Sequence, residues 1–212
     1  MKIVQHILVA SVFLAIVPGS SRADVVASAE TKRATIPEPV QIDTREMPQE
    51  CRPFLEVPAD STSELFAWDQ RLSLAACLEN TTAPAPAARE PEKLRGLVGY
   101  LDESVRRSRA INRDAMAHGP TTQIQRLAAC GLGMTSDNIM VRARTAIPAS
   151  LDLDKRLALH RGLEPLLASY ARDAASAFTE VDRLATRSPA DAQANAVMQA
   201  IVASARSQLG AI

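Results

Sequence analysis

The chain has 212 residues, of which 24 are basic and 24 acidic, and 47% are hydrophobic. This apolar content is enough for a packed core, and the balanced charge is unlike that of a dedicated nucleic-acid-binding protein, which needs basic residues to meet phosphates. Only 3% of the residues are aromatic and there are eight glycines. With abundant alanine, this composition favours an all-α protein over a β-sandwich.

Residues 1–23 have the pattern of a secretory signal peptide. Lys2 is followed by an apolar run from Ile7 to Val17, and small residues stand at Ser21 and Ala23. The pattern predicts cleavage after Ala23, and the apolar run is too short to span a bilayer. We therefore expect an exported protein, periplasmic or secreted, with no transmembrane segment once the leader is removed. The mature chain would carry 22 basic and 24 acidic residues.

The next segment, residues 24–50, mixes charged residues with Pro37, Pro39 and Pro48 and shows no sustained apolar period. Such a composition is typical of a flexible arm. From Cys51 onward helical patterns dominate, so we expect residues 51–212 to form a single helical domain.

Two helices are expected on either side of a proline-rich linker. The stretch Asp60–Asn80 begins with cap residues and is apolar most of the way round, as a buried helix is. The linker Thr81–Pro91 contains prolines, which lack amide donors and cannot continue a helix. Pro91 suits the first turn of the following helix, which we expect to end near Gly119.

A third, shorter helix is predicted from the cap at Thr121 to Leu132, where Gly131 and Gly133 should weaken it. The segment that follows, TSDNIMVRARTAIP, alternates like a strand, but Ser136 or Asp137 could also cap a short helix. Because no second strand is available to pair with it, we predict a helix or irregular structure there.

The C-terminal part has the strongest helical signal. From Ser150 apolar residues recur at steps of three and four over a long helix, which Gly162 and Pro165 should kink. A turn at residues 186–189 and a final helix then complete an antiparallel hairpin. The predicted fold is an all-α bundle of five or six helices with a core that includes Trp68, Leu72, Leu74, Cys77, Leu101, Leu127, Leu163, Leu166, Phe178, Val181, Val197 and Ile201.

Two of the three cysteines close copies of the tetrapeptide LAAC, at Cys77 and Cys130. The residues that flank the two copies do not match, so the recurrence is not a structural repeat. In an oxidising compartment three cysteines predict one disulfide and one remaining thiol. Locality favours the pair Cys51–Cys77, which would pin the arm to the first helix, and Cys77–Cys130 is the alternative. A redox site is not indicated, because there is no Cys-x-x-Cys spacing.

The run RRSRAINRD is the sharpest surface feature of the sequence. Arg106, Arg109 and Arg113 share one helical face. This face is either balanced by the neighbouring acids Asp102, Glu103 and Asp114 and simply solvated, or it is a site for an anion or an acidic partner.

Other patterns are better explained by helix structure than by chemistry. His160 and Glu164 have the spacing of two metal ligands on a helix, but a second histidine is missing, so an exposed ion pair or hydrogen bond is favoured. Asp152 and Asp154 fall in a first helical turn, where acids are stabilised by the helix dipole. His118 likewise suits a helix C-terminus. We assign no catalytic, cofactor-binding or metal-binding residues, and no cofactor.

Export, helical packing and the lack of a catalytic motif together favour an interaction protein that binds a protein partner, as an adaptor, an inhibitor or a component of an envelope assembly. Two alternatives stay open. One is an enzyme, in particular a hydrolase without a recognisable motif that uses carboxylates or a histidine as acid and base. The other is a helical carrier or chaperone-like binder of apolar ligands, which would need an apolar cavity.

Overall fold

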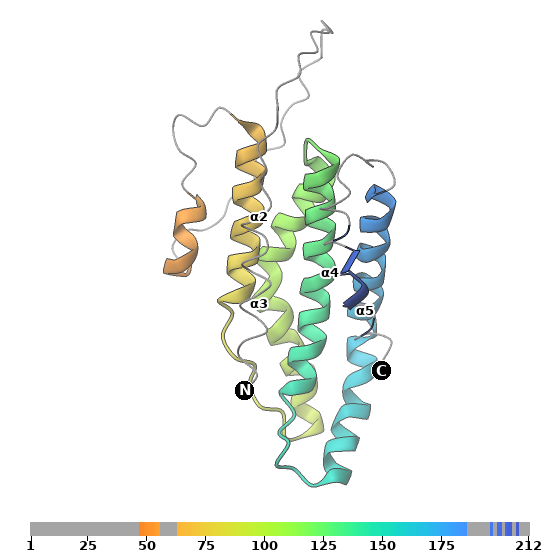
Figure 1. Cartoon of the computed structure of the whole chain (residues 1–212). Helices are drawn as coiled ribbons and strands as arrows, with labels where there is room; N and C mark the ends of the chain where they lie inside the picture. The colour runs from red at the N-terminus through yellow and green to blue at the C-terminus, as the bar shows by residue number, and fades with distance from the viewer. Residues whose placement is uncertain are drawn as a thin grey trace, which may run out of the picture. The chain divides into compact units, whose positions relative to one another are not determined.

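Helices make up most of the part of the chain that the structure, a computed structural model, describes: residues 47–55 and 63–185, with positions 196, 199, 200, 202–204 and 207. They are the 3-10 helix η2 (Gln49–Leu55) and the α-helices α2 (Glu64–Asn80), α3 (Pro91–His118), α4 (Thr122–Thr145) and α5 (Leu153–Ala185) (Figure 1). No strand occurs among these residues, and the all-α fold is confirmed. The predicted leader, most of the arm, and Val197 and Ile201 lie outside the described residues.

The starts of the helices follow from local capping. The Ser63 hydroxyl accepts a hydrogen bond from the backbone N–H of Phe66 at 3.4 Å, and the Thr121 hydroxyl accepts one from Ile124 at 3.2 Å. Pro91 is the first residue of α3, where its missing N–H is not needed. At the start of α5, the Asp152 carboxylate accepts from the N–H of Lys155 at 2.8 Å. Asp152 therefore acts as a cap, as predicted.

Helix α4 differs from the prediction, because residues 122–145 form one uninterrupted helix. Gly131 and Gly133 do not end it, and Ser136 and Asp137 are buried in its interior rather than capping a new helix. The two glycines lie where neighbouring helices come closest. A Cβ at Gly133 would stand 2.4 Å from the Phe178 ring, and one at Gly131 would stand 2.7 Å from the Asn112 side chain.

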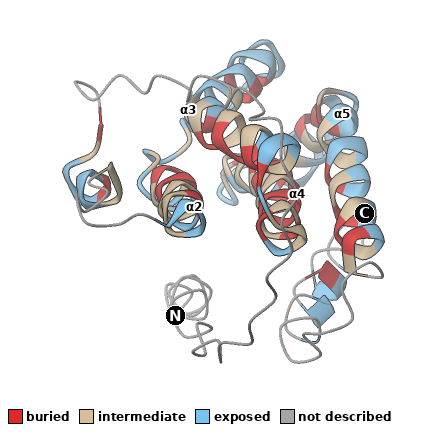
Figure 2. Cartoon of the chain, turned by 90° about the horizontal axis from the view of Figure 1, so that it is seen from above, coloured by how far each residue is buried: buried red, intermediate tan, exposed pale blue. Residues whose placement is uncertain are grey.

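Those two contacts place α4 between α3 and α5, and the end of α2 also packs against it. Figure 2 shows buried residues on the sides of α3, α4 and α5 that face one another. Since α4 has neighbours on several sides, its buried positions extend over most of its circumference. Packing of this kind, rather than intrinsic propensity, provides most of the stability of a helix in a protein.

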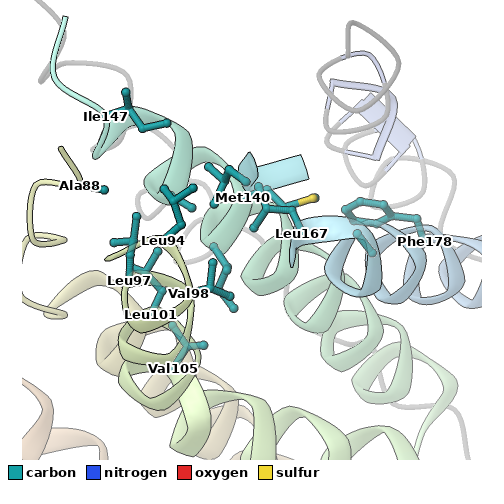
Figure 3. Packing of buried hydrophobic residues seen from close by; sticks show 14 of the residues in the cluster. Ala88, Leu94, Leu97, Val98, Leu101, Val105, Met140, Ile147, Leu167 and Phe178 are labelled. Carbon is teal, nitrogen blue, oxygen red and sulfur yellow. The ribbon is translucent and has the colours of Figure 1, made fainter. Parts of the chain in front are cut away.

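The largest core cluster joins α3, α4 and α5 (Figure 3). Helix α3 contributes one apolar stripe, and the linker before it adds Ala88, whose backbone N–H donates to the carbonyl of Ala146 at 3.0 Å. Val202, in the C-terminal segment, is buried in the same cluster. The labelled members are Ala88, Leu94, Leu97, Val98, Leu101, Val105, Met140, Ile147, Leu167 and Phe178.

Two smaller clusters hold α2 against its neighbours. One contains Met47 and Cys51 with Leu74, Ala75, Leu78 and Ile111, and the other contains Trp68 with Ala115, Ile124 and Ala128. The arm predicted over residues 24–50 thus ends in folded structure, because Met47 is buried and η2 begins at Gln49.

The predicted core residues divide into two groups. Trp68, Leu74, Leu101, Leu163, Phe178 and Val181 are buried, whereas Leu72, Cys77, Leu127 and Leu166 are only half-buried. The buried positions of α5 are Leu159, Leu163, Leu167, Ala174, Phe178, Val181 and Leu184. Its inner face therefore differs from the predicted core at one place, where Leu167 is buried and Leu166 is not. The helix contains Pro165 without interruption, and the bend expected there stays a prediction.

None of the helices in the described part of the chain combines the length and the apolar content that crossing a bilayer requires.

The register of α5 can be tested by truncating adjacent leucines. Leu167 is 1% exposed in the core, so Leu167→Ala should lower the free energy of unfolding by about 2–5 kcal/mol. Leu166→Ala removes the same atoms from a half-buried position and should cost about 1 kcal/mol. Urea unfolding of both variants measures the difference. Equal losses would contradict the assigned inner face.

The close approach of α4 to α5 can be tested with glycine substitutions. Gly133→Ala places a methyl group against the Phe178 ring and should destabilise the protein by about 1–3 kcal/mol. Gly96 also lies in a helix, but nothing is within 4 Å of its added Cβ. Gly96→Ala should therefore stabilise the protein by about 0.5–1 kcal/mol. The two variants are compared in the same unfolding experiment, and a Gly133→Ala variant that is at least as stable as the wild type would refute the close approach.

Candidate functional site

The disulfide joins Cys51 of η2 to Cys77 of α2, with their Cα atoms 5.7 Å apart. This is the pairing that the sequence favoured over Cys77–Cys130. Cys51 is completely buried, and its sulfur lies 3.7 Å from the hydroxyl of Thr81. The bond therefore holds η2 against the C-terminal half of α2, where it has a structural position and is not an exposed redox pair.

Cys130 is the free cysteine of the described chain and is buried in α4. Burial raises the pKa of its thiol to about 11, although the charge of Arg126 opposes the shift. A thiol of this kind stays protonated at neutral pH and is not a reactive nucleophile. Cys130 is thus a small buried apolar residue in the packing of α4.

The three arginines of the predicted patch have different surroundings. Arg106 is exposed and its Nε donates to Glu103 at 2.9 Å, and Arg113 is exposed further along α3. Arg109 is largely covered, with 12% of its side chain exposed. Helical spacing places all three on one face of α3, but α5 covers the middle of that face.

Arg109 belongs to a polar cluster between α3 and α5. Its guanidinium donates to Asp102 at 2.7 Å and to Asp173 at 3.1 Å, and it lies over the ring of Tyr170, 5.7 Å from the centroid. Burial and the Asp102 carboxylate raise the pKa of Tyr170 to about 12. These contacts fasten one helix to another, and they leave Arg109 with two carboxylate partners already bound.

A hollow of about 310 Å³ lies where the chain before η2, the end of α2 and the middle of α3 meet. We call it the α2–α3 hollow. Arg106 lines it together with Arg107, which the sequence analysis did not single out. The lining residues are Pro48, Leu78, Thr81, Thr82, Ala83, Glu103, Ser104, Arg106 and Arg107.

A second hollow, of about 270 Å³, lies between α4 and α5. Its wall is mostly apolar, and the ion pair of Arg144 and Glu164, with atoms 3.1 Å apart, lies at its edge. The remaining lining residues are Met140, Leu167, Ala168, Ala171 and Ala175.

Two buried carboxyl groups lie outside both hollows. One oxygen of Glu79, in the last turn of α2, lies 2.6 Å from the Thr135 hydroxyl, and the other accepts a hydrogen bond from Asn138 at 2.9 Å. Burial raises the pKa of Glu79 above the ordinary value, and so it does for Asp137 in the middle of α4. The hydrogen bonds with Thr135 and Asn138 and the charge of Arg142 oppose the shift at Glu79, and the charge of Arg144 opposes it at Asp137.

The sequence analysis missed both carboxyl groups, although one of them carried a signal. Glu79 is an acid in the last turn of a helix that has no basic residue there, where the helix dipole disfavours negative charge. An unfavourable acid at a helix end is worth noting because it needs a partner elsewhere. Asp137 carried no comparable signal, since the local sequence TSDN resembles an N-cap.

The pair His160 and Glu164 does not form the expected local contact. Both oxygens of Glu164 accept from the guanidinium of Arg144 on α4, at 3.2 and 3.1 Å. His118, at the end of α3, lies 2.9 Å from Asp114, as nitrogen to oxygen. Within the described residues, no three His, Cys, Asp or Glu side chains are grouped in a way that could hold a metal ion.

Comparisons of the chain with protein-family models, curated proteins and solved structures find no match.

The disulfide between Cys51 and Cys77 predicts which peptides are linked and how much stability is lost when the crosslink is removed. Non-reduced peptide mapping should give one peptide that joins residues 51 and 77, with Cys130 alkylated only after unfolding. The crosslink closes a separation of 26 residues, so the double variant Cys51→Ser, Cys77→Ser should lose about 3.5 kcal/mol of stability. Cys130→Ala, the matched control, keeps the crosslink and should lose about 1 kcal/mol. A peptide linking residues 77 and 130 would refute the assignment.

Proposed function

We propose that the protein acts after export as a helical interaction protein, and that it binds an acidic segment of a protein partner in the α2–α3 hollow. The observation that supports this proposal most directly is the composition of the wall. The exposed guanidinium of Arg106 lines the hollow beside Glu103, and the side chain of Arg107 is also part of the wall. A partner segment with carboxylate side chains would complement this charge.

The hydroxyl groups in the wall favour a peptide over a simple anion. Thr81 donates to the carbonyl of Cys77, Thr82 to that of Glu79, and Ser104 to that of Leu101. Because each hydroxyl has one proton, these oxygens are left mainly as acceptors. Of the three, Thr82 already accepts from the Arg142 guanidinium at 2.7 Å. A peptide has backbone N–H groups to donate to them, whereas a phosphate or sulfate ion has none to offer.

The exposed ion pair in the wall would not prevent binding. The side chains of Arg106 and Glu103 are 69% and 66% exposed, and an exposed pair of this kind contributes about 0.2–1 kcal/mol. A partner carboxylate could replace Glu103 at a small cost, since Arg106 would exchange one acceptor for another. The guanidinium is also a planar donor that suits a carboxylate in two-point contact.

Export is the premise of this proposal. The leader pattern supports it, and a disulfide is what a protein of an oxidising compartment often contains. Whether the protein serves as an adaptor, as an inhibitor or as part of an envelope assembly depends on its partner. The proposal makes no use of a cofactor.

An apolar carrier is the second candidate, and one observation favours it. The α4–α5 hollow is lined mostly by apolar side chains and has a volume of about 270 Å³, near the lower limit of ligand pockets. A hydrolase is less well supported, because neither buried carboxyl group, Glu79 or Asp137, lines either hollow.

Photocrosslinking in the cells that make the protein tests the proposed partner site. A photoreactive residue in place of Ser104, in the wall of the hollow, should link to one discrete protein. The same residue in place of Ser176, exposed on α5, should not. Arg106→Glu should weaken binding of the purified partner about tenfold or more, since a charge-assisted hydrogen bond is worth about 1.5–3 kcal/mol.

Arg172→Glu is the matched control, because it changes the net charge equally at an exposed position on α5 and should leave binding unchanged. Equal crosslinking from both positions, or binding that ignores Arg106→Glu, would contradict the proposed site. A partner that instead competes with an apolar dye at the α4–α5 hollow would support the carrier.

A further inference from the structure

The side chain of Glu79 connects two helices that have few other contacts. It lies in the last turn of α2, and both of its oxygens meet α4. Oε2 is 2.6 Å from the hydroxyl of Thr135, and Oε1 accepts from the amide of Asn138 at 2.9 Å. The carboxyl group is therefore the polar link between the end of α2 and the middle of α4.

Counting protons shows which form of this carboxyl fits. The Thr135 hydroxyl lies 2.6 Å from Glu79 Oε2 and 2.8 Å from the carbonyl oxygen of Gly131. If Glu79 is ionised, both neighbours are acceptors and Thr135 has one proton to donate. If Glu79 is protonated, its O–H donates to Thr135, Thr135 donates to Gly131, and Asn138 still donates to Oε1. The protonated form of Glu79 therefore allows all three of these contacts to be hydrogen bonds at the same time.

The surroundings act in the same direction. Burial raises the pKa of Glu79 above its ordinary value of 4.5, and the C-terminal end of a helix disfavours a negative charge. The hydrogen bonds with Thr135 and Asn138 and the charge of Arg142 on α4 oppose the shift, but burial is the largest of these effects, so the pKa is raised. The Arg142 guanidinium itself donates to Thr82, at 2.7 Å, and to the carbonyl of Ala83. No charged side chain among the described residues of α3 and η2 contributes to the shift in the pKa of Glu79.

We infer that Glu79 is a proton-controlled latch, which fastens the end of α2 to α4 as the acid and loosens it as the carboxylate. The proton is exchanged with water, and no other bond is made or broken. Helix α2 stays attached through its apolar contacts, among them those of Trp68, which packs in one cluster with Ala115 of α3 and with Ile124 and Ala128 of α4. Loosening is therefore confined to the last turn of α2 and the residues that follow.

The effect of pH has a definite sign. In the folded protein the pKa of Glu79 lies above 4.5, so the folded state keeps a proton that the unfolded chain has lost. The stabilisation by this proton is complete below pH 4.5 and disappears as the pH rises through the folded-state pKa. Each unit by which the pKa is raised corresponds to roughly a tenfold change in the folding equilibrium.

Glu79→Gln tests the latch because glutamine copies the acid: its oxygen can accept from Asn138 and its amide can donate to Thr135. The full oxidised protein is unfolded in urea between pH 4 and pH 8. The variant should match the wild type at the acid end and become the more stable of the two as the pH rises. A direct check is the carboxyl ¹³C NMR signal that disappears in Glu79→Gln, which should titrate above 4.5.

Hydrogen exchange locates the effect. The amide protons of Thr81 and Thr82 close the end of α2, bonded to the carbonyls of Cys77 and Glu79. After correction for intrinsic rates, their protection in the wild type should fall as the pH rises, and in Glu79→Gln it should not. Asp137→Asn is the control, since Asp137 is also a buried acid in the same stretch of α4, but Arg144 and not Glu79 is the charged group that acts on it. This variant should leave the pH dependence at Thr81 and Thr82 unchanged.

Three results would overturn the inference. They are a titration of Glu79 at or below its ordinary pKa, unfolding curves of wild type and Glu79→Gln that stay parallel at all pH values, and protection at Thr81 and Thr82 that does not depend on pH. All three measurements are made without a partner, so the latch can fail or succeed independently of the proposed binding function.

Discussion

The close approach of α4 to its two neighbours is the constraint on which the rest of the structure depends. At Gly131 the helix meets the side chain of Asn112 on α3, and at Gly133 it meets the Phe178 ring on α5. A side chain at Gly133 would displace the Phe178 ring, and one at Gly131 would require the end of the Asn112 side chain to move. With α4 held in this position, the apolar stripes of α3 and α5 reach it from different sides and form the main cluster. The glycines weaken the helix locally by about 1 kcal/mol each, and dense packing offsets that loss.

Most ionisable side chains near the core serve contacts between helices. Arg109 joins α3 to Asp173 on α5, and Arg144 joins α4 to Glu164 on α5. Glu79 joins α2 to α4. Each of these contacts connects two helices that pack side by side. Apolar packing alone would allow the helices to shift along each other, whereas these polar contacts form only in one relative position. Where such a group is buried, as Glu79 is, its protonation depends on the packing around it.

The disulfide has a related role at the edge of the bundle. It fixes η2 to α2 near the point where Thr81, Thr82 and Ala83 leave the helix, and these three residues line the α2–α3 hollow. The wall of the hollow therefore combines a covalently anchored segment, a helix end held by Glu79 and Arg142, and two arginines of α3, of which Arg106 is exposed and Arg107 is half-buried. A surface assembled from three separate segments keeps its shape only while all three attachments hold. This is the physical link between the latch and the proposed partner site.

Local chemistry in the sequence was enough for several features. The cap residues that begin at Asp60, the cap at Thr121, the proline at position 91 and the spacing of apolar residues predicted which segments are helical and which class of fold results. The structure then shows that Ser63 is the cap of α2. The pairing of Cys51 with Cys77 also followed from locality. These features depend on residues close together in the chain, and their physical causes act over one or two helical turns.

Only the tertiary structure decided the features that depend on neighbours. In the sequence Gly131 and Gly133 resemble the end of a helix. In the structure they lie in the middle of α4, where the absence of a side chain allows the neighbouring helices to pack closely. Leu166 and Leu167 both fit an apolar stripe, and the position of α4 determines which of them is buried. Arg109 resembles its neighbours until α5 covers it. Glu79 gains its partners 56 and 59 residues away. Sequence spacing places a side chain on a helix face, and what that face meets is set by the other helices.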